Sequence, residues 1–317
     1  MVLERQRTRL IDTQEQPERQ SEPTGAVVIA MAQIAPRLGD VATNVARHVG
    51  ILVEAAANGA GLVVFPELSL TGYFLKDLVP ETALRLDSDE IATLCAACVE
   101  IDALVGCVIE SDDSRFYNAA LYISGGAVRH IHRKVYLPTY GLFDEQRYRA
   151  TGDRFETLEL PLLSRNAVRP WHGGVLICED MWHPSAPSLL ARQSVDVFLC
   201  PSASPVRGVL RGAALGTAQS YDVMTRTYAQ LFTAFLVYCN RVGYEDGVKF
   251  WGGSRIIGPD GAPLDEPAGS DEALIYQRVE RSALRRARIE TPLLRDERHD
   301  VNDAETDRIR RERGSTS

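Results

Sequence analysis

Lysine is the residue type that this sequence of 317 residues most clearly lacks. Its 35 basic residues are 32 arginines and only three lysines, Lys76, Lys134 and Lys249. A lysine ammonium is a compact cation whose pKa responds to burial, whereas an arginine stays charged and presents a planar fork. The three retained lysines are therefore positions where the side chain itself needs an explanation.

Excess positive charge and long apolar runs are also missing. The net charge is −8, which argues against a nucleic-acid partner and against attraction to an anionic membrane surface. No apolar run approaches the roughly 20 residues of a membrane-spanning helix, and the first residues lack the apolar core of a signal peptide. The sequence predicts a soluble protein that does not insert into a membrane.

Cysteine is too sparse for a disulfide scaffold. The six cysteines lie mostly inside apolar runs such as DVFLC and FLVYC, which is typical of reduced, buried thiols and predicts a cytoplasmic protein. Cys95 and Cys98 form a C-x-x-C pair without a second pair, and His130 and His132 lack a third ligand at a suitable spacing. We therefore expect no metal and no cofactor.

Polar composition at both ends delimits the folded part of the chain. We expect residues 1–24 to form a mobile tail, residues 25–295 to form one domain, and residues 296–317 to form a polar tail. No stretch inside the domain is rich enough in Pro, Gly and Ser to be an interdomain linker, and no repeat is visible.

Short apolar runs alternate with helical patterns along the domain, which predicts an α/β protein. Direct strand-to-strand connections near residues 103–133 and 250–280 favour mixed sheets. Strands are expected at 27–34, 61–65, 103–109, 118–123, 128–132, 174–178, 195–200, 234–240, 253–257 and 274–279, and helices at 40–58, 91–99, 187–193 and 213–232.

Three reactive side chains follow or end predicted strands. Glu67 comes after GLVVFP, Lys134 after VRHIHR, and Cys178 ends GGVLIC. The carboxyl ends of strands in α/β folds open onto loops where distant residues converge, so we expect these side chains to meet. Taken alone, Glu67 is typical of a loop acid, Lys134 of a surface lysine and Cys178 of an inert strand cysteine. Only their common position at the ends of predicted strands favours a functional site.

The three residue types together suit acyl transfer. A thiol attacks only as a thiolate, so Cys178 needs a base and a positive field nearby. Glu67 is the candidate base for the thiol and later for water. Lys134 is the candidate cation for a tetrahedral intermediate, together with the backbone N–H that follows Cys178.

Three blocks resemble the signatures of the nitrilase, or carbon–nitrogen hydrolase, superfamily. They are FPELSLTGY (65–73), HRKVYLPTYGLFDEQRY (132–148) and LICEDMWHP (176–184), and they occur in the family order. The resemblance implies a four-layer α-β-β-α sandwich with a Glu67–Lys134–Cys178 triad, and Glu145 matches the second glutamate of the family. It also implies a homodimer or larger homo-oligomer.

Within the superfamily, YLPTYGLFDEQRY, ICEDMW, PSASP and KFWGGSRIIGPDG look most like the glutamine-amidase domain of glutamine-dependent NAD synthetases. The sequence ends at Ser317 without a segment resembling their ATP-binding part, and Ser124-Gly125-Gly126 predicts a hairpin turn. We expect a stand-alone amidase that uses water and a small amide. The resemblance suggests residues to recognise a glutamine-like substrate: Tyr73, Tyr140, Glu179, Ser202, Ser204 and Arg207 or Arg211.

Other functions stay open at this stage. The first alternative is N-carbamoyl amine or amino-acid hydrolysis, or nitrile hydrolysis, by the same residues. The second is a catalytically silent subunit, or one that donates ammonia to a separate synthetase partner.

Overall fold

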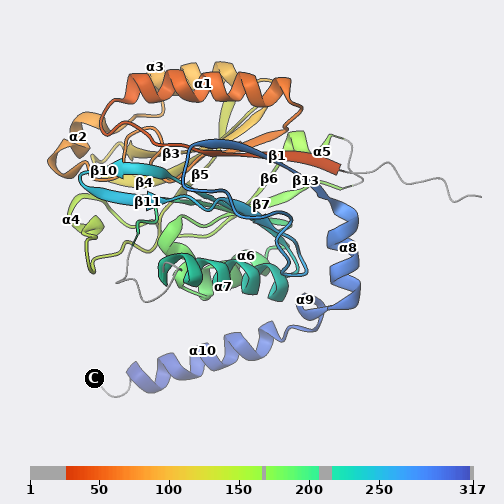
Figure 1. Ribbon diagram of the computed structural model, residues 1–317. Coiled ribbons are helices and arrows are strands. Elements are labelled where there is room, and N and C mark those ends of the chain that lie inside the picture. Colours follow the sequence, from red (N-terminus) through yellow and green to blue (C-terminus); the bar gives the residue numbers. More distant parts are fainter. Residues whose placement is uncertain (1–25, 166–168, 207–215, 315–317) are drawn as a thin grey trace, which may run out of the picture.

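Two β-sheets packed face to face, with helices on both outer sides, form the body of the protein (Figure 1). The computed structural model describes residues 26–165, 169–206 and 216–314. Helices α1 (Val41–Ala57) and α3 (Asp89–Ala97) cover one sheet, and α6 (Ser185–Ala191) and α7 (Gly216–Leu231) cover the other. This arrangement confirms the predicted α-β-β-α sandwich.

The first sheet has the strand order β13-β1-β2-β3-β4-β5, and the second has the order β12-β9-β8-β7-β6. Each contains parallel and antiparallel neighbours, which confirms the prediction of mixed sheets. The strands are β1 (Ala26–Gln33), β2 (Leu62–Val64), β3 (Asp102–Glu110), β4 (Phe116–Ser124), β5 (Ala127–Arg133), β6 (Thr157–Glu159), β7 (His172–Val175), β8 (Val197–Ser202), β9 (Phe235–Asn240), β12 (Arg255–Ile257) and β13 (Ala273–Glu280).

A separate hairpin and the remaining helices complete the elements of the described residues. The hairpin pairs β10 (Val242–Glu245) with β11 (Val248–Trp251). The remaining helices are η1 (Lys76–Leu78), α2 (Val79–Thr82), α4 (Glu145–Tyr148), α5 (Pro161–Ser164), η2 (Cys178–Trp182), α8 (Arg281–Glu290), α9 (Leu293–Asp296) and α10 (His299–Gly314).

Alternating side chains of the central strands fill two different apolar layers. In β1, Ile29 and Met31 belong to the cluster between the two sheets, whereas Ala30 and Ala32 belong to the cluster beneath α1 and α3. Successive strand residues point to opposite faces, so a strand covered on both faces must be apolar throughout. This is why the sequence shows continuous apolar runs here rather than alternation.

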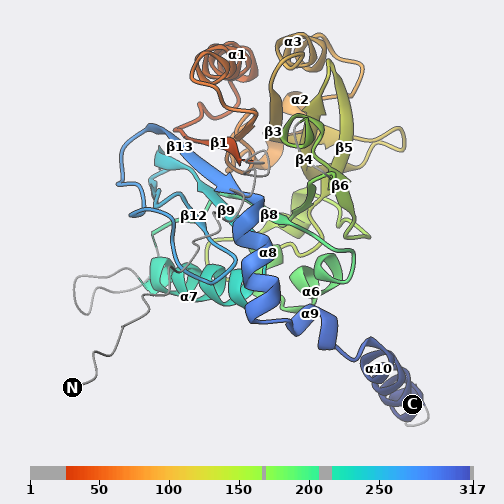
Figure 2. The same cartoon turned by 90° about the vertical axis from the view of Figure 1, so that its right-hand side faces the viewer.

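The last helices leave the sandwich. Helix α8 packs against the body through Leu284, and Arg288 Nη1 donates to the buried Asp196 carboxylate at 2.9 Å. Helix α10 extends away from the body (Figure 2), and Asp303 pairs with Arg192 of the body at 2.7 Å. The sequence predicted a polar tail at residues 296–317 rather than a helix, because the residues of α10 are charged on all sides and form no apolar stripe. The predicted tail at residues 1–24 lies outside the described residues.

All six cysteines are free thiols, and five of them are buried. Among the described residues, no helix combines the length and apolarity that crossing a membrane requires.

Candidate active site

Glu67 is held in a tight turn that follows β2. Leu68, directly after it, has a φ of 52°, which is strained for a residue with a side chain. Gly106 of β3 permits this turn to press against the sheet, because a Cβ at that position would lie 2.4 Å from the Leu68 nitrogen. The backbone of the turn therefore sets the position of Glu67, independently of the contacts that its side chain makes.

Lys134 follows β5 and keeps its strand pairing. Its backbone N–H donates to the Asn118 carbonyl on β4 at 2.8 Å, and its carbonyl accepts from Gly152 at 2.8 Å. A Cβ on Gly152 would lie 2.0 Å from the Arg133 carbonyl oxygen, so only glycine permits the chain to return this closely past the lysine. The lysine backbone is therefore held from both sides.

Cys178 stands at the start of the short 3-10 helix η2. The predicted strand 174–178 begins and ends too late, since β7 spans His172–Val175 and the chain turns at Cys178 with a φ of 47°. Such a strained turn between strand and helix presents a side chain at the end of the sheet. The sulfur is thereby directed toward the loops that carry Glu67 and Lys134.

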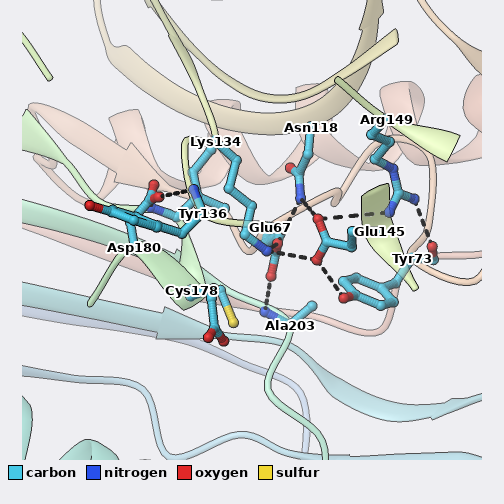
Figure 3. A network of polar contacts seen from close by, with 12 residues as sticks. Glu67, Tyr73, Asn118, Lys134, Tyr136, Glu145, Arg149, Cys178, Asp180 and Ala203 are labelled. Atoms are coloured by element: carbon cyan, nitrogen blue, oxygen red, sulfur yellow. Dashed lines mark hydrogen bonds and ion pairs between the residues drawn. The ribbon is translucent and has the colours of Figure 1, made fainter. Parts of the chain in front are cut away.

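The ammonium of Lys134 lies between two buried carboxylates (Figure 3). Its Nζ is 2.7 Å from Glu67 Oε1 and 2.7 Å from Glu145 Oε1. Burial of an ion pair is favourable only when the geometry is good and the remaining polar atoms are hydrogen-bonded. Here Asn118 Nδ2 donates to Glu67 Oε1 at 2.8 Å, and the Ala203 N–H donates to Glu67 Oε2 at 2.8 Å.

Glu145 is anchored by further donors on its far side. The Tyr73 hydroxyl donates to Glu145 Oε1, Asn118 Nδ2 donates to Oε2 at 3.3 Å, and Arg149 Nη1 lies 3.9 Å from Oε2. Two carboxylates thus face two cations, Lys134 and Arg149. We call Glu67, Asn118, Lys134, Glu145 and Arg149 the ion network.

Within the ion network, Lys134 and Glu145 stabilise each other's charged forms. Burial disfavours the ammonium of Lys134, but the Glu145 and Glu67 carboxylates outweigh it and raise the pKa of Lys134 above its ordinary value. Burial acts to raise the pKa of Glu145, but Lys134 and Arg149 outweigh it and lower that pKa. Lys134 is therefore a permanent cation beside Cys178 across the physiological pH range.

The thiol of Cys178 is protonated at rest. Burial and the Glu67 carboxylate raise its pKa, while Lys134 and a hydrogen bond with Tyr221 act in the opposite direction. A thiolate therefore requires a base that removes the proton locally. Figure 3 shows Cys178 beside Glu67.

A cavity of about 520 Å³ opens in front of Cys178. Its described lining includes Tyr140, Phe143, Glu179, Trp182, Ser204, Pro205, Ser220 and Tyr221, with no lysine or arginine. The Tyr140 hydroxyl donates to the Glu179 carboxylate at 2.9 Å. Burial raises the pKa of Glu179, against the effects of Tyr140 and Lys134, so this carboxyl titrates above the ordinary range.

The predicted substrate residues separate into three groups. Tyr140, Glu179 and Ser204 line the cavity. Tyr73 lies behind Glu145, and Ser202 is buried at the end of β8, and neither is among the lining residues. Arg207 and Arg211 lie outside the described residues.

A buried aspartate joins the lysine segment to the cysteine turn. Asp180 Oδ1 accepts from the Val135 and Tyr136 N–H groups at 3.1 and 3.0 Å. Its Oδ2 accepts from the Ile177 N–H at 3.0 Å and lies 2.9 Å from His132 Nε2. One carboxylate thus fixes the residues next to Lys134 and next to Cys178 relative to each other.

Sequence reasoning missed several of these groups. Asn118 carried a signal, since it is the polar residue within the apolar strand YNAALY. Asp180 lies two residues after the cysteine, inside the block LICEDMWHP, and the sequence predicted no separate role for it. Tyr221 gave no signal, because one tyrosine in a helix is indistinguishable from a core residue. No cluster of three or more potential metal-binding side chains exists within the part of the chain that is described.

The fold and this site define an α/β protein that buries a lysine between two glutamates beside a cysteine at a cavity. The family model for carbon–nitrogen hydrolases matches residues 28–289. The chain therefore belongs to the carbon–nitrogen hydrolase family.

Relatives fall into two groups. The glutamine-dependent NAD(+) synthetase of Acinetobacter baylyi is 32% identical over 249 residues, which cover 78% of this chain and 43% of that protein. An (R)-stereoselective amidase of Pseudomonas is 30% identical over 278 residues, covering 85% of this chain and 91% of that protein. The chain thus spans less than half the length of the NAD synthetases that it matches.

Solved structures support the same fold. A carbon–nitrogen hydrolase of Helicobacter pylori superposes with a TM-score of 0.74 at 22% identity, covering 89% of this chain and 98% of that one. The glutamine-dependent NAD+ synthetase of Acinetobacter baumannii gives a TM-score of 0.70 at 27% identity, covering 82% of this chain and 46% of that one.

Proposed function

We propose that this protein hydrolyses the carbon–nitrogen bond of a small carboxamide through a thioester on Cys178. The proposal rests on the position of Lys134, whose Nζ lies 2.7 Å from a carboxylate oxygen of Glu67 and 2.7 Å from one of Glu145. This ammonium lies beside the strained turn at Cys178, which lines a cavity. Membership in the carbon–nitrogen hydrolase family and the similarity to an amidase support it.

Acylation begins when Glu67 removes the thiol proton. The sulfur forms a bond to the amide carbon, and the carbonyl electron pair moves onto oxygen as an oxyanion. Lys134 and the Glu179 N–H stabilise this charge, because preorganised donors act strongly in a buried site. The C–N bond then breaks, and Glu67 returns its proton to the nitrogen, which leaves as ammonia.

Deacylation repeats the steps with water. Glu67 takes a proton from water, and the hydroxide oxygen attacks the thioester carbon. The C–S bond breaks and its electron pair returns to the sulfur. Glu67 then gives its proton to the sulfur as the carboxylic acid leaves, which regenerates the thiol and the carboxylate. The reaction consumes one amide and one water and needs no oxidant, reductant or cofactor.

The described cavity favours an acyl group that carries an amine. Glu179 is the one charged residue among its described lining residues, and a carboxylate is the natural acceptor for an ammonium. A glutamine-like substrate suits this polarity, and the NAD synthetase relatives use glutamine by name. That similarity also favours a second candidate, delivery of the released ammonia to a separate synthetase.

A substrate panel tests the proposal. Glutamine, simple amides, N-carbamoyl-β-alanine, N-carbamoylputrescine and nitriles are each scored for ammonia release with wild-type protein and with Cys178→Ala. We expect release from glutamine or a simple amide and none from the variant. Preference for N-carbamoyl compounds or nitriles would replace the amide assignment, and release by Cys178→Ala would overturn the mechanism. Co-purification with an ATP-using synthetase would support the second candidate.

A further inference from the structure

A tyrosine hydroxyl outside the three signature blocks touches the reacting sulfur. The Tyr221 hydroxyl lies 3.2 Å from Cys178 Sγ, and Trp182 Nε1 lies 3.3 Å from the same hydroxyl. We propose that Tyr221 is a further catalytic residue, whose hydroxyl donates a hydrogen bond to the Cys178 thiolate. This inference rests on the proposed function.

The direction of the hydrogen bonds follows from the chemistry of the three groups. An indole nitrogen only donates, so Trp182 occupies a lone pair of the Tyr221 oxygen and leaves the phenolic proton for another acceptor. A thiolate can only accept. The chain of donors therefore runs from Trp182 to Tyr221 to Cys178 whenever the sulfur is charged.

Packing holds the tyrosine ring in place. Tyr221 lies on α7 and is 1% exposed. Its ring meets the Trp182 ring edge-on with centroids 5.8 Å apart and the Tyr238 ring at 4.8 Å. A donor fixed before the reaction costs no reorganisation when charge develops on the sulfur. Tyr221 and Trp182 also line the cavity, so this donor chain forms part of the wall that faces the substrate.

The reaction places negative charge on the sulfur twice. The first time is when Glu67 takes the thiol proton before attack, and the second is when the C–S bond breaks and its electron pair returns to the sulfur. Burial and Glu67 oppose this charge by raising the pKa of Cys178. A hydrogen bond to the thiolate lowers the free energy of both states, so its loss slows acylation and deacylation together.

The same helix supplies a matched control. The hydroxyl of Tyr228 donates to the Met181 carbonyl at 2.9 Å, in the same η2 turn that begins at Cys178. Tyr228→Phe therefore removes an equivalent buried hydroxyl from the same helix and the same turn without touching the sulfur. Comparing Tyr228→Phe with Tyr221→Phe therefore distinguishes a hydroxyl that only supports the cysteine turn from one that stabilises the thiolate.

The test measures ionisation of Cys178 independently of any substrate. Full-length wild-type protein, Tyr221→Phe, Trp182→Phe and Tyr228→Phe are alkylated with iodoacetamide across a pH series, and the rate at Cys178 is read by peptide mass spectrometry. Since a hydrogen bond to a charged group stabilises it strongly, we expect the midpoint to rise by about one to two pH units in Tyr221→Phe. A smaller rise is expected in Trp182→Phe, and none in Tyr228→Phe.

Steady-state ammonia release completes the test. We expect kcat/KM to fall by about 10- to 100-fold in Tyr221→Phe and to stay near the wild-type value in Tyr228→Phe. An unchanged alkylation midpoint in Tyr221→Phe, or an equal rise in Tyr228→Phe, overturns the role of Tyr221. If Tyr221→Phe fails to fold, an unchanged midpoint in Trp182→Phe overturns it instead. Turnover by Cys178→Ala overturns the proposed function, whatever the alkylation midpoints show.

Discussion

The two sides of Cys178 differ in how completely they are determined. Behind it, every charged group of the ion network has partners from separate parts of the chain: the turn after β2, strand β4, the end of β5, and helix α4. In front of it lies a cavity with one described carboxylate, Glu179, and mostly aromatic and hydroxyl side chains. The difference teaches that the scaffold holds the ion network in one arrangement, whereas loops and helix α7 line the cavity in front of the cysteine.

Replacing Lys134 should produce the largest loss on the network side. Lys134→Arg keeps the charge, but a planar guanidinium cannot occupy a space with carboxylate oxygens 2.7 Å away on both sides. We expect turnover to fall by about 10²–10³-fold or more, as for loss of a donor to an oxyanion. Initial rates of ammonia release measure this.

The matched control for that variant is Lys249→Arg, since Lys249 is exposed on β11. Its activity should equal that of the wild type. If Lys134→Arg also kept wild-type activity, the ion network would tolerate a different cation. The network would then be no more strictly determined than the cavity, which contradicts the difference drawn between the two sides of Cys178.

Asp180 should give an intermediate effect, because it positions groups and does not react. In Asp180→Asn, an amide NH2 replaces one carboxylate oxygen and faces backbone N–H groups that now donate to that oxygen. Two donors repel each other, so the lysine segment and the cysteine turn should separate. A displacement of about 1 Å costs on the order of 100-fold in rate. We expect kcat to fall by about 10- to 100-fold with KM nearly unchanged.

Asp196→Asn is the control for burial, since Asp196 is a fully buried carboxylate that accepts from Arg288 outside the site. Both variants should lower the melting temperature, and only Asp180→Asn should lower kcat in the folded protein. Equal losses of kcat would show that Asp180 acts through stability alone.

Glu179, the charged residue of the cavity side, should affect KM rather than kcat, with the smallest effect. The pKa of Glu179 lies above the ordinary range, mainly through burial. It therefore loses its charge as pH falls through this raised pKa and becomes charged as pH rises. For an amide with an amino group, KM should fall as pH rises through that value.

Glu179→Gln should abolish this pH dependence and raise KM by about tenfold, since it removes a charge-assisted hydrogen bond. A neutral amide measured with the same two proteins should show no difference. A loss of kcat for both substrates would move Glu179 from the cavity side to the reaction itself.

The sequence predicted best where one physical rule dominated. Continuous apolar runs gave the central strands, and residues at strand ends placed Glu67, Lys134 and Cys178 together. Tyr221 was not predictable, because its role depends on the helix α7 crossing beside the cysteine turn, a contact 43 residues away along the chain. Helix α10 was missed because its exposed, charged residues show no apolar period. Strands β6, β10 and β11 were missed because three or four residues are too few to establish an alternation.

The central claim is that the ion network activates one cysteine among six. The most direct measurement reacts the protein with its amide substrate, quenches it in acid within a turnover, and maps adducts by peptide mass spectrometry. The account predicts an acyl group on Cys178 alone, with one ammonia released per chain before steady state. Adducts spread evenly over Cys95, Cys107 and Cys200, or ammonia release without any adduct on Cys178, would contradict it.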